Sequence, residues 1–89
     1  MKEKIEILKK CGFEDVETVL KRFNRENKLK HDRLVAEIEL LKSRGKNTIL
    51  LYCKNGEVIN RYSKETLESK SIDELIESFK SFLDMELAK

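Results

Sequence analysis

The 89-residue sequence has no proline and only three glycines. Proline breaks helices and glycine loosens them, so their scarcity favours long uninterrupted helices. No apolar run approaches the ~18 residues of a membrane-spanning helix. The N-terminus, Met1 to Glu6, mixes charged with apolar residues and lacks the hydrophobic region of a signal peptide. Together these absences predict a helix-rich protein with a cytoplasmic location and no membrane partner.

Residue types that carry catalysis or hold metals are also scarce. The single histidine, His31, lies in a charged stretch, where a solvated surface role is the common one. Cys11 and Cys53 form neither a C-x-x-C pair nor a Cys/His set with metal-ligand spacing, and without an export signal we expect reduced thiols. Glycine-rich phosphate loops and nucleophile motifs are absent. The sequence predicts a protein that is not an enzyme, with no catalytic residue, no metal and no cofactor.

What the sequence does have is charge and periodic apolar residues. Charged residues make up 40% of the chain and hydrophobic ones 39%, while the net charge is only +2. Because the apolar residues cluster at regular spacings, we expect a folded chain rather than a disordered one. Its length predicts one domain over 1–89. The small net charge does not by itself indicate a polyanionic partner.

The strongest local signal is Asn55-Gly56, which lies between two β-rich segments over 48–63. Asn-Gly accepts the positive φ angles of a type I′ turn and predicts an antiparallel β-hairpin. A two-residue loop would pair Lys54 with Glu57, and the predicted pairs then continue in the order Cys53–Val58, Tyr52–Ile59, Leu51–Asn60, Leu50–Arg61 and Ile49–Tyr62.

This register gives the predicted hairpin one mainly apolar face and one mixed face. The first face carries Ile49, Leu51, Cys53, Val58, Asn60 and Tyr62. The second combines apolar with charged residues, and we expect it to be partly covered, either by the N-terminal helix or by a partner protein. The residues proposed to bind that partner are Leu50, Tyr52, Ile59 and Arg61.

Before the hairpin, the pattern predicts a short helix over 3–11, ended by Gly12, and a helical region that begins near Glu14 and ends at Gly45. Apolar stripes mark both ends of this region, but residues 24–33 contain one apolar residue. Without proline or glycine to break it, a single helix over 14–44 is slightly favoured over two helices. Such a helix exceeds what one hairpin can cover, so it predicts a homodimer.

In its broken form, residues 5–44 resemble a ubiquitin-associated domain. Cys11-Gly12-Phe13 stands where that family carries a Met-Gly-Phe loop, and residues 24–29 would form its second loop. The resemblance implies a bundle of three short helices. The small residues that the family has inside its second helix are absent here, so we do not assign the chain to it.

After the hairpin, a polar connection over 63–71 leads to the clearest helix, over 72–87. Ser71 and Glu74 form a capping box at its start. Its apolar stripe comprises Ile72, Leu75, Ile76, Phe79, Phe82, Leu83 and Leu87. The predicted fold class is α+β, with helical part 3–44, β-hairpin 48–63 and amphipathic C-terminal helix 72–87.

Two functional hypotheses follow. The first is a small cytoplasmic protein-interaction module, an adaptor, regulator or inhibitor that acts by surface contact. The alternative is a nucleic-acid-binding regulator that uses the basic stretch 21–33, whose net charge is +4. Its basic residues are Lys21, Arg22, Arg25, Lys28, Lys30 and Arg33. Because the last helix carries a net charge of −4, an offsetting pairing between the two stretches, within one molecule or between two, competes with nucleic-acid binding.

Overall fold

The computed structural model describes residues 1–88 and confirms the α+β fold class. In chain order the elements are α1 (Lys2–Lys10), β1 (Glu14–Asp15), α2 (Val16–Glu26), α3 (Lys28–Ser43), β2 (Thr48–Lys54), β3 (Glu57–Ser63), α4 (Lys64–Ser69) and α5 (Ile72–Leu87). The three strands form an antiparallel sheet in the order β1-β2-β3.

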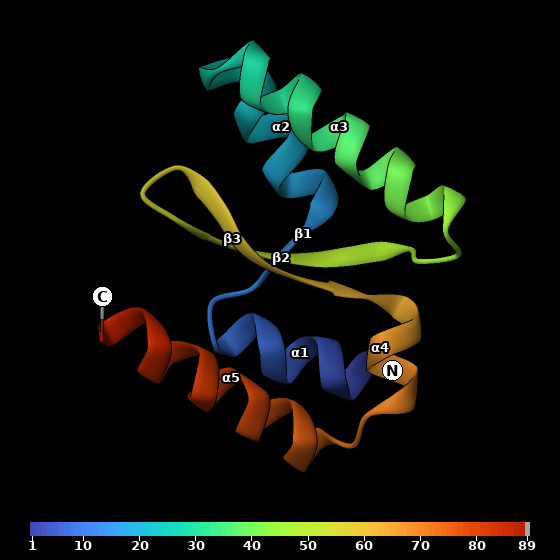
Figure 1. Ribbon diagram of the computed structural model, residues 1–89, viewed down its shortest axis with the longest axis vertical. Coiled ribbons are helices and arrows are strands. Elements are labelled where there is room, and N and C mark those ends of the chain that lie inside the picture. Colours follow the sequence, from blue (N-terminus) through green and yellow to red (C-terminus); the bar gives the residue numbers. More distant parts are fainter. Residues whose placement is uncertain (89) are drawn as a thin grey trace.

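The sheet is the middle of three layers (Figure 1). Helices α2 and α3 cover one face, and α1, α4 and α5 lie on the other. Two adjacent residues of β2, Leu50 and Leu51, are both fully buried, one in each of the two cores. The expectation that the second face of the hairpin is covered is therefore confirmed, and the cover comes from the chain itself.

Each core is a small cluster of apolar side chains. On the α1/α5 side, Phe13 packs against Tyr52, Tyr62 and Phe79 with ring centroids 5.2–5.5 Å apart. The buried members of this cluster are Leu8, Phe13, Leu50, Tyr62, Leu67, Leu75 and Phe79. The buried members on the α2/α3 side are Val19, Phe23, Leu34 and Leu51.

The β2–β3 hairpin confirms the predicted turn. Asn55 and Gly56 both have positive φ, 54° and 76°, as a type I′ turn requires. The pairs Lys54–Glu57 and Cys53–Val58 also match the prediction. The next pair is Tyr52–Asn60, so Ile59 has no partner in β2 and forms a β-bulge.

From Tyr52 to Leu50 the predicted register is wrong by one residue, and it is restored at the pair Thr48–Ser63. Arg61 lies opposite Leu51 and Tyr62 opposite Leu50. Since side chains alternate between the faces of a sheet, the shift moves Tyr62 into the α1/α5 core and Arg61 to the α3 side. A second irregularity, at Ile49, lies near the start of β2.

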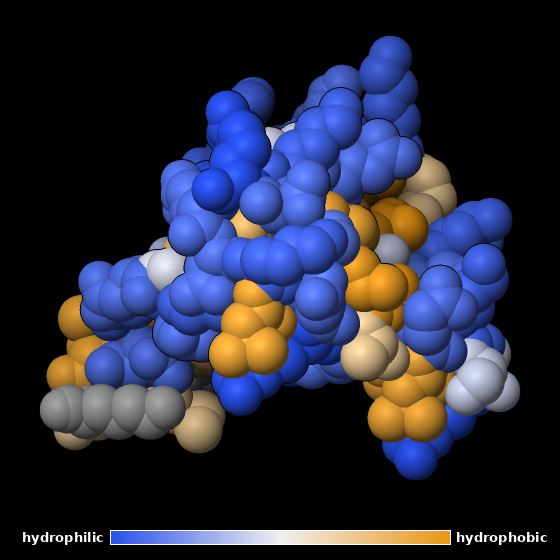
Figure 2. Space-filling model, turned by 90° about the horizontal axis from the view of Figure 1, so that it is seen from above, coloured by the Kyte–Doolittle hydropathy of each residue, from blue (hydrophilic) through white to orange (hydrophobic). Residues whose placement is uncertain are grey.

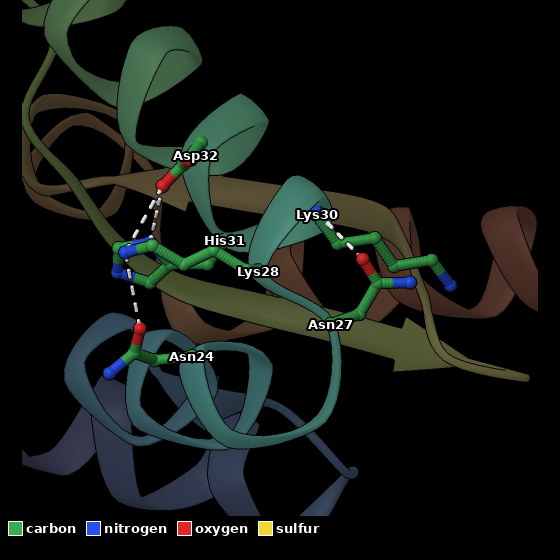
Figure 3. Close-up of polar contacts among 6 residues, drawn as sticks. All are labelled: Asn24, Asn27, Lys28, Lys30, His31 and Asp32. Carbon is green, nitrogen blue, oxygen red and sulfur yellow. Dashed lines mark hydrogen bonds and ion pairs between the residues drawn. The ribbon is translucent and has the colours of Figure 1, made fainter.

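The prediction of one helix over 14–44 is wrong, because the chain breaks at Asn27. This residue is extended, with φ −156° and ψ 96°, and ends α2. Its side-chain oxygen accepts a hydrogen bond from the backbone N–H of Lys30, which caps α3 (Figure 3). The break lets the apolar stripes of both helices pack on one face of the sheet. The homodimer was predicted because a single long helix would leave apolar surface uncovered, and this reason no longer holds.

The N-terminal helix ends as predicted. Gly12 has φ 114°, and the N–H of Phe13 donates to the carbonyl of Leu8, which is the hydrogen bond of a Schellman motif. The chain then enters β1 instead of a second helix. Because α1 and α2 lie on opposite faces of the sheet, residues 5–44 do not form the three-helix bundle of a ubiquitin-associated domain.

The C-terminal part agrees with the sequence except in its connection. Within the predicted polar connection over 63–71, residues 64–69 form the short helix α4, and its Leu67 is fully buried. Ser71 and Glu74 make both hydrogen bonds of the predicted capping box. Along the stripe of α5, Leu75 and Phe79 are buried, whereas Leu87 is exposed.

We predict that Phe79→Ala destabilises the protein by about 3–5 kcal/mol, because the ring is buried among aromatic neighbours and its loss leaves a cavity. Chemical denaturation monitored by circular dichroism measures the change. Met85→Ala, on the exposed surface of the same helix, is the control and should shift stability by less than about 0.5 kcal/mol. A loss below about 1 kcal/mol for Phe79→Ala would contradict this packing.

Candidate functional site at the open edge of β3

Strand β3 is an edge of the sheet, with hydrogen-bonded pairing to β2 on one side only. The backbone N–H of Arg61 donates to Oδ1 of its neighbour Asn60 at 2.8 Å. In a strand, alternate residues direct their backbone groups to opposite sides. We therefore infer that the N–H of Arg61 points to the open side of β3, where a side chain of the same strand occupies it.

A groove runs between β3 and α3, and we call it the β3–α3 groove. It contains two hollows, of about 190 Å³ and 170 Å³, and Arg61 lines both. The first hollow is lined by Phe23, Lys30, Arg33, Leu34, Glu37, Glu57, Val58 and Arg61. The second is lined by Leu41, Lys46, Thr48, Arg61, Ser63 and Thr66. Each hollow is smaller than the ~300–1,000 Å³ of ordinary small-molecule sites, so the groove suits individual side chains of a larger partner.

Two ion pairs cross the groove. Arg61 Nε lies 3.0 Å from a carboxylate oxygen of Glu37 on α3, and Lys30 Nζ lies 2.9 Å from one of Glu57. Lys30 Nζ also donates to the carbonyl of Gly56 in the hairpin turn. Both ion pairs are between side chains, so neither uses the backbone groups of β3. Both are partly exposed, so each adds at most about 1 kcal/mol to stability.

The four residues predicted to bind a partner do not share one surface. Leu50 is fully buried under α1 and α5, and Tyr52 is half-buried beside it. Ile59 is the bulged residue of β3, and Arg61 lines the groove on the α3 side. The structure thus brings two of the four, Ile59 and Arg61, together on the open strand and places Leu50 in the α1/α5 core with Tyr52 packed against it.

The six basic residues of stretch 21–33 divide equally into paired and unpaired groups. Arg22 makes two hydrogen bonds to the Glu14 carboxylate, Lys28 pairs with Asp32 at 3.5 Å, and Lys30 pairs with Glu57. Figure 3 shows Lys28 beside Asn24 and Asp32, while Lys30 extends in another direction. The other three, Lys21, Arg25 and Arg33, are exposed, and their side chains have no hydrogen bond or ion pair with residues 1–88.

Of the two forms of pairing expected between the basic stretch and the acidic C-terminal helix, the one within a single molecule is wrong, and the one between two molecules stays a prediction. The sheet separates α5 from α2 and α3, and the acids that do pair with the stretch are Glu14, Asp32 and Glu57. Figure 2 looks down on the α2–α3 layer, which is largely hydrophilic, with hydrophobic surface showing in places between the polar side chains.

Sequence reasoning missed Glu37, Leu41 and Lys46 as groove residues. Lys30, Glu37 and Leu41 recur at the spacing of one helix face, and that stripe is visible once α3 is taken to begin after Asn27. The pairing of Glu37 with Arg61 depends on the β-bulge, for which the sequence carries no comparable signal.

Residues 1–88 contain no group of three or more His, Cys, Asp or Glu side chains placed to hold a metal ion. Burial raises the pKa of the Cys53 thiol, which keeps it protonated at neutral pH. None of the helices in this part of the chain combines the length and hydropathy needed to cross a membrane. No protein-family model, curated protein or solved structure matches the chain.

The Glu14–Arg22 pair predicts a pH dependence of stability. The hydrogen bonds from Arg22 hold the pKa of Glu14 below its ordinary value. Their stabilising contribution is therefore present above the pKa of unfolded glutamate, about 4.3, and is lost as the pH falls through the lower folded value.

Arg22→Gln should reduce the free energy of unfolding by about 1 kcal/mol at pH 7, and wild type and variant should converge towards pH 3. Urea denaturation at several pH values measures this difference. Lys21→Gln, which removes a neighbouring charge that has no partner, should show no such convergence. A wild-type advantage that stays constant down to pH 3 would mean that the carboxylate of Glu14 is not its source.

Proposed function

We propose that this protein is a non-enzymatic interaction module that binds an extended segment of a partner protein along the open edge of β3. The observation that carries the proposal is an edge strand of seven residues beside a groove with an apolar floor. An edge strand presents unpaired backbone donors and acceptors to an incoming strand. Added strands obtain affinity from main-chain hydrogen bonds and specificity from pockets for alternate side chains, and the β3–α3 groove offers both.

The floor of the first hollow supports this mode of binding. Phe23 and Leu34 are each 5% exposed, and Val58 is half-buried beside them. A partner side chain that entered the hollow would therefore meet apolar surface below and charged groups at the rim. Such a core and rim are typical of protein–protein contacts.

The proposal includes a cytoplasmic location. Its support is that Cys11 packs on the α1/α5 side of the sheet and Cys53 on the α2/α3 side, both as free thiols. Two thiols on opposite faces of a sheet cannot pair with each other, and proteins with unpaired thiols are common in reducing compartments.

The test of strand addition is a display selection of short random peptides against the immobilised protein, followed by affinity measurements with two variants. Arg61→Pro removes the backbone N–H that we assign to the open side, and Arg61→Gln removes the charge but keeps the N–H. We expect selected peptides to lose at least about tenfold in affinity with Arg61→Pro, the equivalent of one or more hydrogen bonds, and to retain most of it with Arg61→Gln.

Circular dichroism must show that both variants remain folded. Equal binding to wild type and a folded Arg61→Pro variant would place the contact elsewhere, and failure to select any peptide would contradict the proposed function. A second copy of the chain could also pair with β3, and sedimentation of the free protein tests this. A dimer that Arg61→Pro dissociates would show such pairing, in place of a partner protein.

The nucleic-acid alternative gives a contrasting prediction. Three of the six basic residues are neutralised by neighbouring acids, so we expect no submicromolar binding to single-stranded DNA, duplex DNA or RNA at physiological salt. Fluorescence polarisation with labelled oligonucleotides measures this. Submicromolar binding that disappears in the Lys21→Gln/Arg25→Gln/Arg33→Gln variant, with a salt slope of up to ~3, would favour nucleic-acid binding over our proposal.

A further inference from the structure

The β3–α3 groove has more cationic than anionic side chains, and this excess favours an acidic partner. Four cationic side chains line it, Lys30, Arg33, Lys46 and Arg61, and two anionic ones, Glu37 and Glu57. Each acid is already matched, Glu37 with Arg61 and Glu57 with Lys30. This leaves Arg33 and Lys46, both exposed and without a side-chain hydrogen bond or ion pair among residues 1–88.

The two unmatched cations belong to different hollows. Arg33 lines the first hollow, beside the apolar floor, and Lys46 lines the second, beyond the Arg61–Glu37 pair. From Arg33 to the end of α3 the helix rises ~15 Å, and Lys46 lies beside the last turn of α3, because its backbone N–H donates to the carbonyl of Leu41. An extended strand covers that distance in about four or five residues. Because side chains on one face of a strand recur every second residue, positions i and i+4 of a bound strand can both face the groove.

We propose that the partner segment is acidic and extended, with carboxylate side chains at positions i and i+4. One carboxylate lies near Arg33 and the other near Lys46. This inference rests on the proposed strand addition at β3 and adds the chemistry that the groove selects.

Charge complementarity decides against a basic segment. Lysine or arginine at the same two positions would lie beside unmatched cations and would have to compete with Lys30 and Arg61 for Glu37 and Glu57. The acids of this groove are held by the protein's own cations, whereas Arg33 and Lys46 are available. Since like charges at an interface are unfavourable, the groove discriminates by repulsion as well as by attraction.

The test uses three synthetic peptides that share one threonine- and valine-rich sequence with valine at i+2. They differ only in carrying glutamate, glutamine or lysine at i and i+4. Affinities are measured by fluorescence polarisation at low and physiological salt. We expect the glutamate peptide to bind roughly tenfold more tightly than the lysine peptide at low salt, with a smaller difference at higher salt.

Two charge-reversal variants show where this preference comes from. Arg33→Glu/Lys46→Glu changes the two groove cations and should reverse the order, so that the lysine peptide binds best. Lys21→Glu/Arg25→Glu makes the same change in net charge at two exposed, unpaired residues of α2 and should leave the order unchanged. Circular dichroism confirms that both variants are folded.

Each outcome separates this inference from the proposed function. Equal affinities for the three peptides, lost with Arg61→Pro, would overturn the acidic preference and leave strand addition intact. A glutamate preference abolished by the α2 variant and not by the groove variant would overturn the inference by placing the acidic contact on α2. Absence of binding by all three peptides and by any selected peptide would overturn both.

Discussion

The structure depends on one constraint, which is that β2 is apolar on both faces. Leu50 and Leu51 are adjacent in sequence and point to opposite sides of the sheet, and each is fully buried. Full burial of a leucine stabilises a protein by about 1.5–3 kcal/mol, so neither face can be left to water without a large loss. The chain therefore places helices in two layers, one on each face of the sheet. The turn at Gly12 and the cap at Asn27 are the two points where the N-terminal half is redirected to achieve it.

The bulge at Ile59 connects this core to the surface. It moves Tyr62 into the α1/α5 core and turns Arg61 towards α3, where it pairs with Glu37. Tyr62 thereby packs against Phe13, with the two ring centroids 5.2 Å apart. Arg61 lines both hollows of the β3–α3 groove. One inserted residue thus serves both packing and the candidate site, in keeping with the common use of bulges to redirect side chains near functional positions.

Turns and helix caps formed by residues close in the chain can be predicted from this sequence. The contacts between distant segments cannot. Asn55-Gly56, Gly12 and the Ser71/Glu74 capping box each fix the backbone through residues close in the chain, and all three were predicted correctly. A turn within residues 24–28 is the weaker of the two sequence interpretations, because an asparagine ends a helix less strongly than proline or glycine does, and the structure places the break there, at Asn27. The bulge reversed the faces assigned to Arg61 and Tyr62. Of the candidate site, the sequence pointed to Ile59 and Arg61, but Glu37 and Lys46 join them only through the tertiary fold.

The proposed function requires that the free edge of β3 accepts a strand. Nuclear magnetic resonance of the isotope-labelled protein bound to an unlabelled glutamate peptide can detect this pairing. Strand addition predicts interstrand nuclear Overhauser effects between the peptide backbone and Ile59 and Arg61, with the amide of Arg61 becoming protected from hydrogen exchange as it leaves the side chain of Asn60 for a peptide carbonyl. A bound peptide whose contacts lie on α2 or α5, with the backbone of β3 unchanged, would contradict the claim.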